Sequence, residues 1–401
     1  MPGSSAEPAD GVAELWAVPA RGYDRAVTPY WLDERGPAFP PVEPAETVDV
    51  AIVGAGITGC ACALALAEAG LRVRLVDGRR VAEGASGRNG GFALRGTASP
   101  YDEVVAAHGR EQALELWQWT EAELRALGTL AGRAFRPVGS LRLAADAEER
   151  EDIRDEIEAL WADGLDATWV DEPDGPLAGR FTGAIHHPTD AALQPARLVR
   201  GLAERAAAAG AEIVEYRRVE DPAELRAERV VVATDGYPSG LLGPIEGLIV
   251  PTRGQVIATE PLAERLFEVP HYGRHGFDYW HQAEDGRLVA GGFRDISLDT
   301  EFTDEEEVTD HVQRALSSFV DELVGREVRV DYRWAGIFGL VLDFLPVVGP
   351  VPDLPETWVA GGYSGHGNVL GFACGRLVAR ALLDDRDPLL DLFEPARLLG
   401  V

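Results

Sequence analysis

The hydrophobic and polar positions near residue 50 follow the pattern of a strand, a helix and a second strand. The apolar, β-branched run at 48–53 predicts a buried strand. The small-residue segment at 57–70 predicts a helix that ends at Gly70, and the run at 71–77 predicts the next strand. Together these segments predict one βαβ unit.

Further along the chain, apolar residues that recur every three to four positions predict helices, and shorter apolar or alternating runs predict strands. We expect helices at 101–128, 146–164 and 304–323, a helix followed by a strand within 194–216, and a last helix that ends near Leu383. Strands are expected at 138–144, 229–234, 253–259, 286–292 and 357–363. The fold class that this order predicts is α/β.

Composition places the chain among ordinary globular proteins. Its 401 residues suffice for two or more packed units, and 46% of them are hydrophobic and 26% charged. The net charge of −30 argues against nucleic acid or an anionic membrane as a partner held by bulk charge. No apolar run approaches the roughly 18 to 20 residues of a membrane span, and the N-terminus lacks the features of a signal peptide. We therefore expect a cytoplasmic protein.

The residue types that are absent or rare exclude several kinds of chemistry. All 37 basic residues are arginine, so Schiff-base chemistry and lysine general bases are excluded. Cys60 and Cys62 stand two positions apart in a predicted helix and face in different directions, which argues against a dithiol or zinc site. The pair His186 and His187 has no obvious carboxylate or thiolate partners, so we expect no metal site.

The strongest motif joins the first predicted strand to the first predicted helix. Gly54, Gly56 and Gly59 form a G-x-G-x-x-G fingerprint, and Asp77 ends the next strand 77 − 54 = 23 residues later. The glycines let the backbone approach a pyrophosphate, and the helix N-terminus supplies N–H donors and positive potential. The Asp77 carboxylate would accept hydrogen bonds from both ribose hydroxyls and repel an adenosine 2′-phosphate. The fingerprint by itself does not separate NAD from FAD.

Five further segments separate these two cofactors. They are SGRNGG (86–91), VVVATDGY (230–237), RGQVIATEPL (253–262), WAGIFGLVLDFLPVVGP (334–350) and GGYSGHGN (361–368). In this order they resemble the D-amino-acid-oxidase-like family of FAD-dependent amine oxidoreductases, whose members include glycine oxidase, monomeric sarcosine oxidase and γ-glutamylputrescine oxidase. The resemblance covers residues 29–385, and TPYWLDE (28–34) is typical of the putrescine-type branch.

The resemblance implies an α/β fold in which a Rossmann-type FAD-binding domain is interleaved with an α+β substrate domain built on a mostly antiparallel sheet. Residues 1–46 would form an N-terminal arm. The FAD-binding domain would comprise 47–100, 183–240 and 330–401, and the substrate domain 101–182 and 241–329.

The resemblance and the motifs together indicate which residues bind FAD. Backbone N–H groups of the loop 86–91 would meet the pyrophosphate or the flavin edge and Arg88 would pair with a phosphate, unless the loop is a plain surface turn. The turn 365–368 would direct the dipole of the last helix at the flavin pyrimidine ring. Asp343 would bind the ribityl chain or order its own loop, and Asp235 is either a ligand or a turn cap. The full set of expected FAD contacts is Gly54, Gly56, Ile57, Thr58, Gly59, Asp77, Gly78, Ser86, Arg88, Asn89, Gly90, Gly91, Val219, Thr234, Gly236, Asp343, Gly365, His366, Gly367 and Asn368.

The substrate half contains a cluster of aromatic and histidine residues. Tyr279 and His281 share one face of a predicted strand, whereas Trp280 points to the other face. An aromatic cage suits a cationic or apolar amine, and ordinary core packing is the alternative. The expected catalytic residues are Arg95, Tyr279, His281 and His366. By the resemblance, Arg95 matches an arginine near the flavin and the substrate carboxylate, and His366 is either a substrate contact or a helix cap.

The resemblance implies oxidation of the C–N bond of an amine or amino acid. A hydride would pass from the carbon beside the amine to flavin N5, and water would hydrolyse the imine. Val369 stands where sarcosine-oxidase-like members carry a carboxylate-binding lysine, and the lysine that speeds their reaction with oxygen is absent here. Because this lysine is absent, both oxygen and another molecule stay open as the acceptor of the electrons from reduced flavin. No cysteine lies near 334–339, so FAD is expected to be non-covalent. The alternatives are a dehydrogenase and a non-catalytic flavin-binding subunit of a multi-subunit oxidase.

Overall fold

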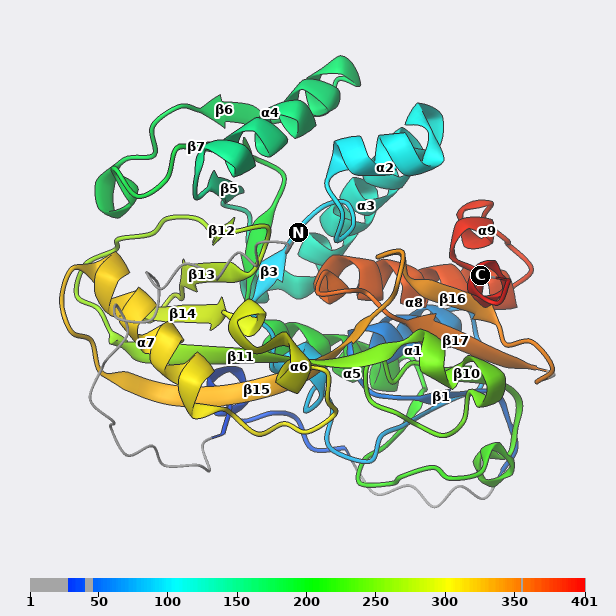
Figure 1. Ribbon diagram of the computed structural model, residues 1–401. Helices are drawn as coiled ribbons and strands as arrows, with labels where there is room; N and C mark the ends of the chain where they lie inside the picture. The colour runs from blue at the N-terminus through cyan, green and yellow to red at the C-terminus, as the bar shows by residue number, and fades with distance from the viewer. Residues whose placement is uncertain (1–27, 40–45, 355, 401) are drawn as a thin grey trace, which may run out of the picture.

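Three β-sheets organise the part of the chain that the computed structural model describes, which is residues 28–39, 46–354 and 356–400 (Figure 1). The six-stranded sheet has the order β16-β17-β10-β1-β2-β9. Its strands are β1 (Val48–Val53), β2 (Val73–Val76), β9 (Glu212–Val214), β10 (Ala227–Val232), β16 (Val347–Pro350) and β17 (Thr357–Gly361). All neighbours in it pair in parallel except β16 and β17. With α1 (Ile57–Glu68) between β1 and β2, the predicted βαβ unit is confirmed.

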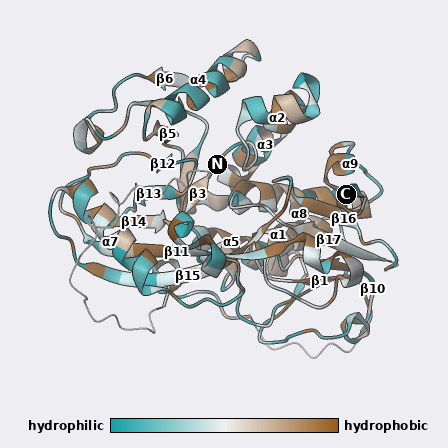
Figure 2. Cartoon of the chain, in the orientation of Figure 1, coloured by the Kyte–Doolittle hydropathy of each residue, from teal (hydrophilic) through white to brown (hydrophobic). Residues whose placement is uncertain are grey.

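Closely packed helices lie against this sheet. α1 contacts both α5 (Pro195–Ala208) and α8 (Gly367–Leu382). Gly375 lets α8 approach α1, because a Cβ there would lie 2.3 Å from the carbonyl oxygen of Thr58. In Figure 2, the brown that marks hydrophobic residues covers much of α8 and of the strands β16 and β17 beside it. Near this contact, the hydroxyl of Thr58 in the first turn of α1 lies 2.8 Å from the hydroxyl of Tyr363, which precedes α8.

The eight-stranded sheet has the order β15-β11-β14-β13-β12-β5-β7-β6 and is antiparallel except for the β12–β5 pair. Its strands are β5 (Ser140–Ala144), β6 (Thr168–Val170), β7 (Gly183–His187), β11 (Val250–Pro261), β12 (His271–Gly273), β13 (Asp278–Gln282), β14 (Arg287–Gly292) and β15 (Val330–Leu340). α7 (Asp310–Val324) covers one face, where the Trp280 and Phe319 rings pack edge-on with centroids 5.2 Å apart. The predicted fold class, with a mostly antiparallel second sheet, is confirmed.

A small third sheet and the remaining helices complete the fold. β8 (Ala191–Leu193) pairs with both β3 (Phe92–Ala93) and β4 (Phe135–Arg136). The other α-helices are α2 (Tyr101–His108), α3 (Arg110–Ala131), α4 (Ala147–Ala162), α6 (Leu298–Glu301) and α9 (Leu389–Phe393). Within the described ranges, none of the helices combines the length and apolar character that a membrane-spanning segment requires.

Two predicted helices differ from the structure. The segment 101–128 forms two helices, because Gly109 between them has φ 87° and ψ 153° and interrupts the helical backbone. The helix predicted at 304–323 begins only at Asp310. The N–H of Thr309 donates to the Gln255 side chain at 2.9 Å, and residues 304–309 lie outside any helix.

The predicted domain boundaries stay a prediction. β7 and β15 fall in ranges predicted for the FAD-binding domain, and both pair within the eight-stranded sheet. Most of the predicted arm 1–46 lies outside the described residues. Trp31, within the arm, is 2% exposed and stacks on His281.

Candidate functional site

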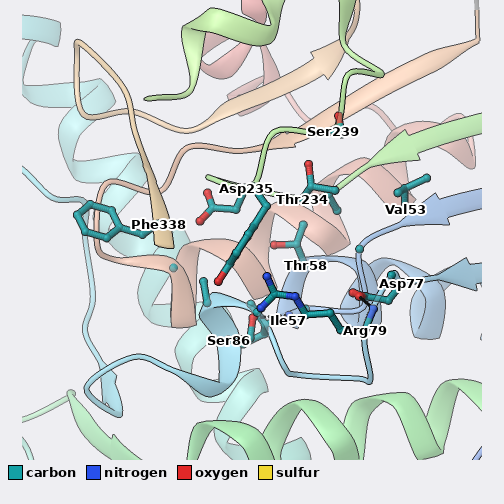
Figure 3. Close-up of a pocket in the computed structure, with 18 of the residues that line it drawn as sticks. Val53, Ile57, Thr58, Asp77, Arg79, Ser86, Thr234, Asp235, Ser239 and Phe338 are labelled. Carbon is teal, nitrogen blue, oxygen red and sulfur yellow. Dashed lines mark hydrogen bonds between the residues drawn. The ribbon is translucent and has the colours of Figure 1, made fainter. Parts of the chain in front are cut away.

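A cavity of about 420 Å³ lies at one edge of the six-stranded sheet (Figure 3). Its lining comes from the ends of β1, β2 and β10, from the segments 84–89 and 217–219, and from the turn before α8. The carboxyl ends of parallel strands meet here, which is the edge where open α/β sheets bind ligands. The volume falls within the range of about 300 to 1,000 Å³ that is typical of small-molecule sites.

The three fingerprint glycines shape one wall of the cavity. Gly54 has φ +106°, a conformation that side-chain-bearing residues rarely adopt. A Cβ on Gly59 would lie 1.9 Å from the carbonyl oxygen of Gly54, and one on Gly56 would lie 2.9 Å from the Ser86 hydroxyl. Gly54 and Gly56 line the cavity, whereas Gly59 permits the tight turn behind them. The wall is therefore bare backbone.

The first turn of α1 faces this wall. Gly56 is the N-cap residue and offers no side-chain capping bond. The N–H of Ile57 donates to Ser86 Oγ at 2.9 Å, and Ile57 and Thr58 both line the cavity. Since a helix N-terminus carries a partial positive charge, this arrangement favours a phosphate group.

Asp77 holds its carboxylate at the cavity wall just after β2. One oxygen accepts a hydrogen bond from the N–H of Ala55 and the other from the N–H of Arg79, each at 2.7 Å. Burial raises the pKa of Asp77, while these two hydrogen bonds and the Arg79 charge oppose the shift. Each carboxylate oxygen has a second lone pair, so both can accept a further bond, as from a ribose hydroxyl.

Asn89 and Asn368 join the second glycine loop to α8. Their side chains exchange two hydrogen bonds, at 3.2 and 3.0 Å, and Asn368 also donates to the carbonyl oxygen of Phe92 at 2.7 Å. Both asparagines line the cavity together with Gly365 and Gly367. The cavity wall is thus continuous from the N-terminus of α1 to the N-terminus of α8.

The cavity brings together thirteen of the predicted FAD contacts, which are Gly54, Gly56, Ile57, Thr58, Asp77, Gly78, Ser86, Asn89, Val219, Thr234, Gly365, Gly367 and Asn368. The predicted contacts outside its lining are Gly59, Arg88, Gly90, Gly91, Gly236, Asp343 and His366. The contacts of these residues explain the difference.

Arg88 and Asp343 are held by ion pairs away from the cavity. Arg88 lies 3.3 Å from Glu306 and donates to the carbonyl oxygen of Glu83 at 2.8 Å. Protein groups thus engage the Arg88 guanidinium in this structure, and its predicted phosphate contact stays a prediction. Asp343 pairs with Arg397 at 2.8 Å and accepts a backbone N–H from its own turn. These contacts fit the predicted role of ordering its own loop, and the alternative, binding of the ribityl chain, stays a prediction.

Three glycines outside the lining bring the two large sheets together. A Cβ on Gly236 would lie 2.4 Å from the backbone of Phe338. A Cβ on Gly90 would lie 2.6 Å from the Tyr279 ring, and one on Gly91 would lie 2.9 Å from His281 Nε2. These positions act in packing, since each places a backbone segment of the cavity region against the eight-stranded sheet.

Tyr279 and His281 lie on the face of β13 that meets the glycine loop 86–91. The Phe92 ring packs edge-on against both, with centroids 5.7 and 5.6 Å away. Trp280 points to the opposite face, into the core beneath α7, as predicted. His281 is 2% exposed, and burial lowers its pKa to about 3, so its ring is neutral near neutral pH. Neither Tyr279 nor His281 is part of the cavity lining itself.

The other two expected catalytic residues have different surroundings. Both terminal nitrogens of the Arg95 guanidinium donate hydrogen bonds inside the protein, one to the Glu121 carboxylate at 2.5 Å and the other to the carbonyl oxygen of Asp166 at 2.6 Å. Its predicted contact with a substrate carboxylate stays a prediction, since in this structure both nitrogens donate to protein groups. His366 is the N-cap residue of α8 but makes no side-chain capping bond, and burial lowers its pKa to about 4.

Sequence reasoning missed several residues that line the cavity, namely Arg79, Arg217, Arg218, Ser239, Asp304 and Tyr363. The position of Arg79, two residues after Asp77, could have revealed it. No motif in the sequence around Asp304 marks it as a cavity residue. It belongs to a segment that packs on the eight-stranded sheet, and folding brings this segment to the cavity. We name that segment, residues 294–309, the strap.

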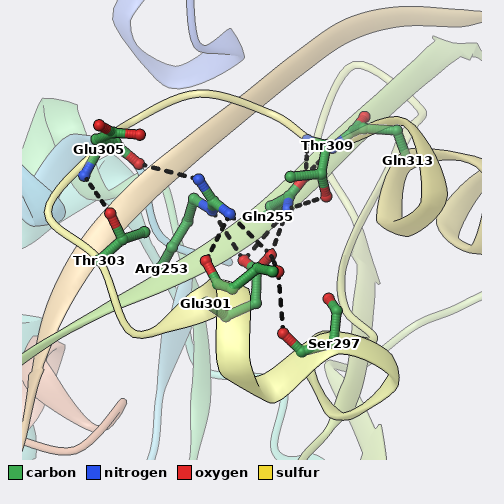
Figure 4. A network of polar contacts seen from close by, with 9 residues as sticks. Arg253, Gln255, Ser297, Glu301, Thr303, Glu305, Thr309 and Gln313 are labelled. Atoms are coloured by element: carbon green, nitrogen blue, oxygen red, sulfur yellow. Dashed lines mark hydrogen bonds and ion pairs between the residues drawn. The ribbon is translucent and has the colours of Figure 1, made fainter.

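Two polar networks hold the strap in place. At its centre, the Glu301 carboxylate is 1% exposed and accepts hydrogen bonds from Arg253, at 2.9 and 3.0 Å, and from Gln255 (Figure 4). Nearer its end, Glu306 pairs with Arg79 at 2.7 Å and accepts from the Tyr237 hydroxyl at 2.5 Å. Asp304 lies between these anchors, and the strap therefore forms one rim of the cavity.

Residues 49–381 match the family model described as DAO: FAD dependent oxidoreductase. The chain belongs to this family. The sequence resemblance is thereby confirmed, and so is the assignment as an FAD-dependent oxidoreductase.

Several relatives of this DAO-family member match along nearly their whole length. The chain is 28% identical to the probable oxidoreductase OrdL of Haemophilus influenzae, over 94% of this chain and 93% of that protein. It is 29% identical to gamma-glutamylputrescine oxidoreductase of Escherichia coli, over 85% of each. The fold is similar to that of glycine oxidase from Geobacillus kaustophilus, with a TM-score of 0.73 at 24% identity over 89% of this chain and 100% of that chain.

The cavity of this DAO-family protein fits FAD in its chemistry. The bare backbone at Gly54 and Gly56 and the N-terminus of α1 would hold the pyrophosphate. Asp77 would hold the adenosine ribose, as its free lone pairs allow. Asn89 and Asn368 form the far end of the same wall, beside the N-terminus of α8.

Proposed function

We propose that the protein oxidises the C–N bond of an amine or amino acid to an imine, which water then hydrolyses. FAD, when bound, supplies the two-electron acceptor that takes the hydride from the carbon beside the nitrogen. One observation carries this proposal. The cavity that fits FAD borders the aromatic face of the eight-stranded sheet, since Phe338 of β15 lines the cavity and Phe92 packs on Tyr279.

The residues on that face have the properties that amine oxidation requires. Tyr279, Phe92 and His281 present aromatic surfaces without a charge, because burial raises the pKa of Tyr279 to about 12 and lowers that of His281 to about 3. Desolvation by such a surface disfavours an ammonium group, so it promotes the neutral amine from which a hydride is lost. The relatives gamma-glutamylputrescine oxidoreductase and glycine oxidase support the same substrate class.

The proposal is tested by mixing the purified single chain, saturated with FAD, with a panel of amines and amino acids under argon. Loss of the oxidised flavin absorbance with at least one member of the panel is the expected result. A flavin that stays oxidised with all of them, but is bleached by dithionite, would support a non-catalytic flavin-binding subunit instead.

We expect FAD to be bound without a covalent link. Cys60, Cys62 and Cys374 are buried, and burial raises the pKa of each thiol, so none is a reactive thiolate at the cavity. Acid precipitation of the holoprotein should release yellow flavin into the supernatant. Flavin that stays with the pellet would contradict this prediction.

A second version of the function, a dehydrogenase with an acceptor other than oxygen, is favoured by the complete lack of lysine in the chain. Without a fixed ammonium group to stabilise superoxide, we expect dithionite-reduced protein to react with oxygen about 10²-fold more slowly than lysine-bearing amine oxidases. Stopped-flow mixing with oxygenated buffer measures this rate, and mixing with a quinone is the control. Reoxidation by oxygen as fast as in those oxidases would show that the protein is an oxidase.

A further inference from the structure

Two tryptophans hold successive carbonyl groups of the glycine loop 86–91. The indole N–H of Trp334 donates to the carbonyl oxygen of Arg88 at 2.7 Å, and the indole N–H of Trp31 donates to that of Asn89 at 2.8 Å. Both tryptophans are 2% exposed, so water has little access to these bonds. Because the two bonds hold adjacent peptide groups, they fix the orientation of both. We name this pair of tryptophans the indole clamp.

Trp334 reaches the loop from the eight-stranded sheet. It lies in β15, in the same cross-strand row as Tyr279 of β13. Residues of one row point to one face of a sheet, so Trp334 lies on the face that meets the glycine loop. The loop packs directly on this strand, because a Cβ on Gly336 would lie 2.7 Å from the Cβ of Arg88.

Trp31 reaches the loop from the N-terminal arm. It lies in the 3-10 helix η1 (Tyr30–Leu32), and its ring stacks on His281 with centroids 5.8 Å apart and planes 12° apart. A Cβ on Gly91 would lie 3.1 Å from the Trp31 ring, so the ring packs on the backbone of the loop. The side chain of Gln194 donates to the Trp31 carbonyl oxygen at 3.1 Å and anchors this part of the arm. The arm therefore contributes a residue to the surroundings of the cavity.

The indole clamp sets the direction of two backbone N–H groups. In a trans peptide the C=O and N–H bonds point in opposite directions. Since the carbonyls of Arg88 and Asn89 point to the indoles, the N–H groups of Asn89 and Gly90 point away from them. Neither N–H donates to an acceptor within the described ranges, whereas the N–H of Gly91 donates to the Asn89 side chain at 2.8 Å. Gly90 is buried, where an unpaired N–H is costly, so both donors are available to a ligand.

The two free donors lie at the wall of the cavity that fits FAD. Asn89 lines the cavity, and its side chain accepts a hydrogen bond from Asn368 in the first turn of α8. A Cβ on Gly90 would lie 2.6 Å from the Tyr279 ring, so this peptide group separates the cavity wall from the aromatic face. The N-terminus of α8 and the free N–H groups all present positive ends. This suits the part of FAD that gains negative charge on reduction, which is the flavin ring.

We propose that Trp31 and Trp334 are positioning residues for the flavin ring. They hold the loop so that the N–H groups of Asn89 and Gly90 donate to acceptor atoms at the edge of the ring, although neither tryptophan lines the cavity. Two N–H dipoles with their positive ends toward the ring favour reduced over oxidised flavin, so the indole clamp raises the midpoint potential of the flavin. This effect is independent of the substrate that the protein oxidises.

The effect is tested by measuring the flavin midpoint potential of the holoproteins Trp31→Phe and Trp334→Phe, each of which keeps an aromatic ring and loses one indole N–H. In each variant we expect the preference for reduced over oxidised flavin to fall at least fivefold. For a two-electron couple this lowers the potential by about 20 mV, at roughly 30 mV per tenfold change. Trp161→Phe is the matched control, because Trp161 donates to the carbonyl oxygen of Ala167 at 2.8 Å and does not line the cavity. It should leave the potential unchanged.

A replacement that preserves the shape of the ring separates the hydrogen bond from packing. In 3-benzothienylalanine, sulfur takes the place of the indole N–H and the bicyclic ring stays the same size. Its incorporation at Trp31 should keep the stacking on His281 and still lower the potential. This variant gives the same test if Trp31→Phe does not fold. A potential equal to the parent's would show that Trp31 acts by packing alone and would overturn its role as a donor.

The two donors are observed directly by amide hydrogen exchange, measured by NMR on the apoprotein and the holoprotein. In the parent we expect FAD to slow exchange at Asn89 and Gly90 at least tenfold. Since each indole orients one peptide group, Trp334→Phe should reduce this protection mainly at Asn89, and Trp31→Phe mainly at Gly90.

Three results would overturn the role of the indole clamp. They are amides whose exchange FAD leaves unchanged, a midpoint potential that neither Trp31→Phe nor Trp334→Phe lowers, and an equal lowering in Trp161→Phe. Failure of the proposed function gives a different pattern. In that case no amine bleaches the flavin, yet the two clamp variants still lower its potential.

Discussion

Gly59→Ala is expected to yield a protein that no longer retains flavin. The new Cβ would lie 1.9 Å from the carbonyl oxygen of Gly54, which is backbone and cannot rotate away. The turn must therefore open, and Gly54 and Gly56, which form the wall of the cavity, must move with it. We expect the flavin content after purification to fall below about a tenth of the parent's, and unfolding to become easier by about 1 to 3 kcal/mol, the usual effect of overpacking.

Flavin content is measured by absorbance after gel filtration, and stability by urea unfolding of the apoproteins. Gly201→Ala is the matched control, because Gly201 lies in α5 and a Cβ there meets nothing within 4 Å. This control should keep full flavin content and gain about 0.5 to 1 kcal/mol in stability, since alanine favours a helix over glycine. Full flavin retention in Gly59→Ala would mean that the turn tolerates a side chain and that the glycine is not required.

Asp77→Ala is expected to weaken FAD binding by about 10- to 100-fold, because hydrogen bonds to a charged group contribute about 1.5 to 3 kcal/mol. The carboxylate stands at the cavity wall with lone pairs free for a ribose, and it also accepts the N–H groups of Ala55 and Arg79. Dissociation constants are obtained by titrating apoprotein with FAD and following the quenching of flavin fluorescence.

A second titration separates the two tasks of Asp77. FMN lacks the adenosine, so its binding should be nearly the same in the parent and in Asp77→Ala if the carboxylate holds the ribose. An equal loss of FAD and FMN binding would show instead that Asp77 acts by organising its loop through Ala55 and Arg79. Unchanged FAD affinity would rule out both roles.

The parts of the site that the sequence predicted are those whose geometry is local. The turn after β1 depends on Gly54 and Gly59, which are five residues apart, and on the helix that begins at Ile57. Alternation along β13 likewise predicted that Tyr279 and His281 share a face, because side-chain direction in a strand depends only on the parity of the position. The break between α2 and α3 also has a local cause, and Gly109 is the residue from which it could have been predicted.

The roles of the charged residues were decided by the tertiary structure. Arg88 belongs to the predicted cofactor loop, but folding brings Glu306 to 3.3 Å from it. Arg95 forms an ion pair with Glu121, and Asp343 forms one with Arg397, which lies near the C-terminus. Asp295 and Glu301 likewise form ion pairs with Arg274 and Arg253, which come from other strands and turns of the chain.

The physical reason lies in the range of the interactions. Glycine conformation, helix starts and strand alternation follow from sterics and hydrogen bonds among neighbours in the chain, so the sequence alone determined the βαβ unit, the fingerprint and the α/β class of this protein. A charged side chain inside a protein takes whichever counter-ion packing brings within reach, and that partner is often hundreds of residues away, as Glu306 is for Arg79. Only the folded chain could therefore decide which arginines are neutralised by the protein and which remain available to a ligand.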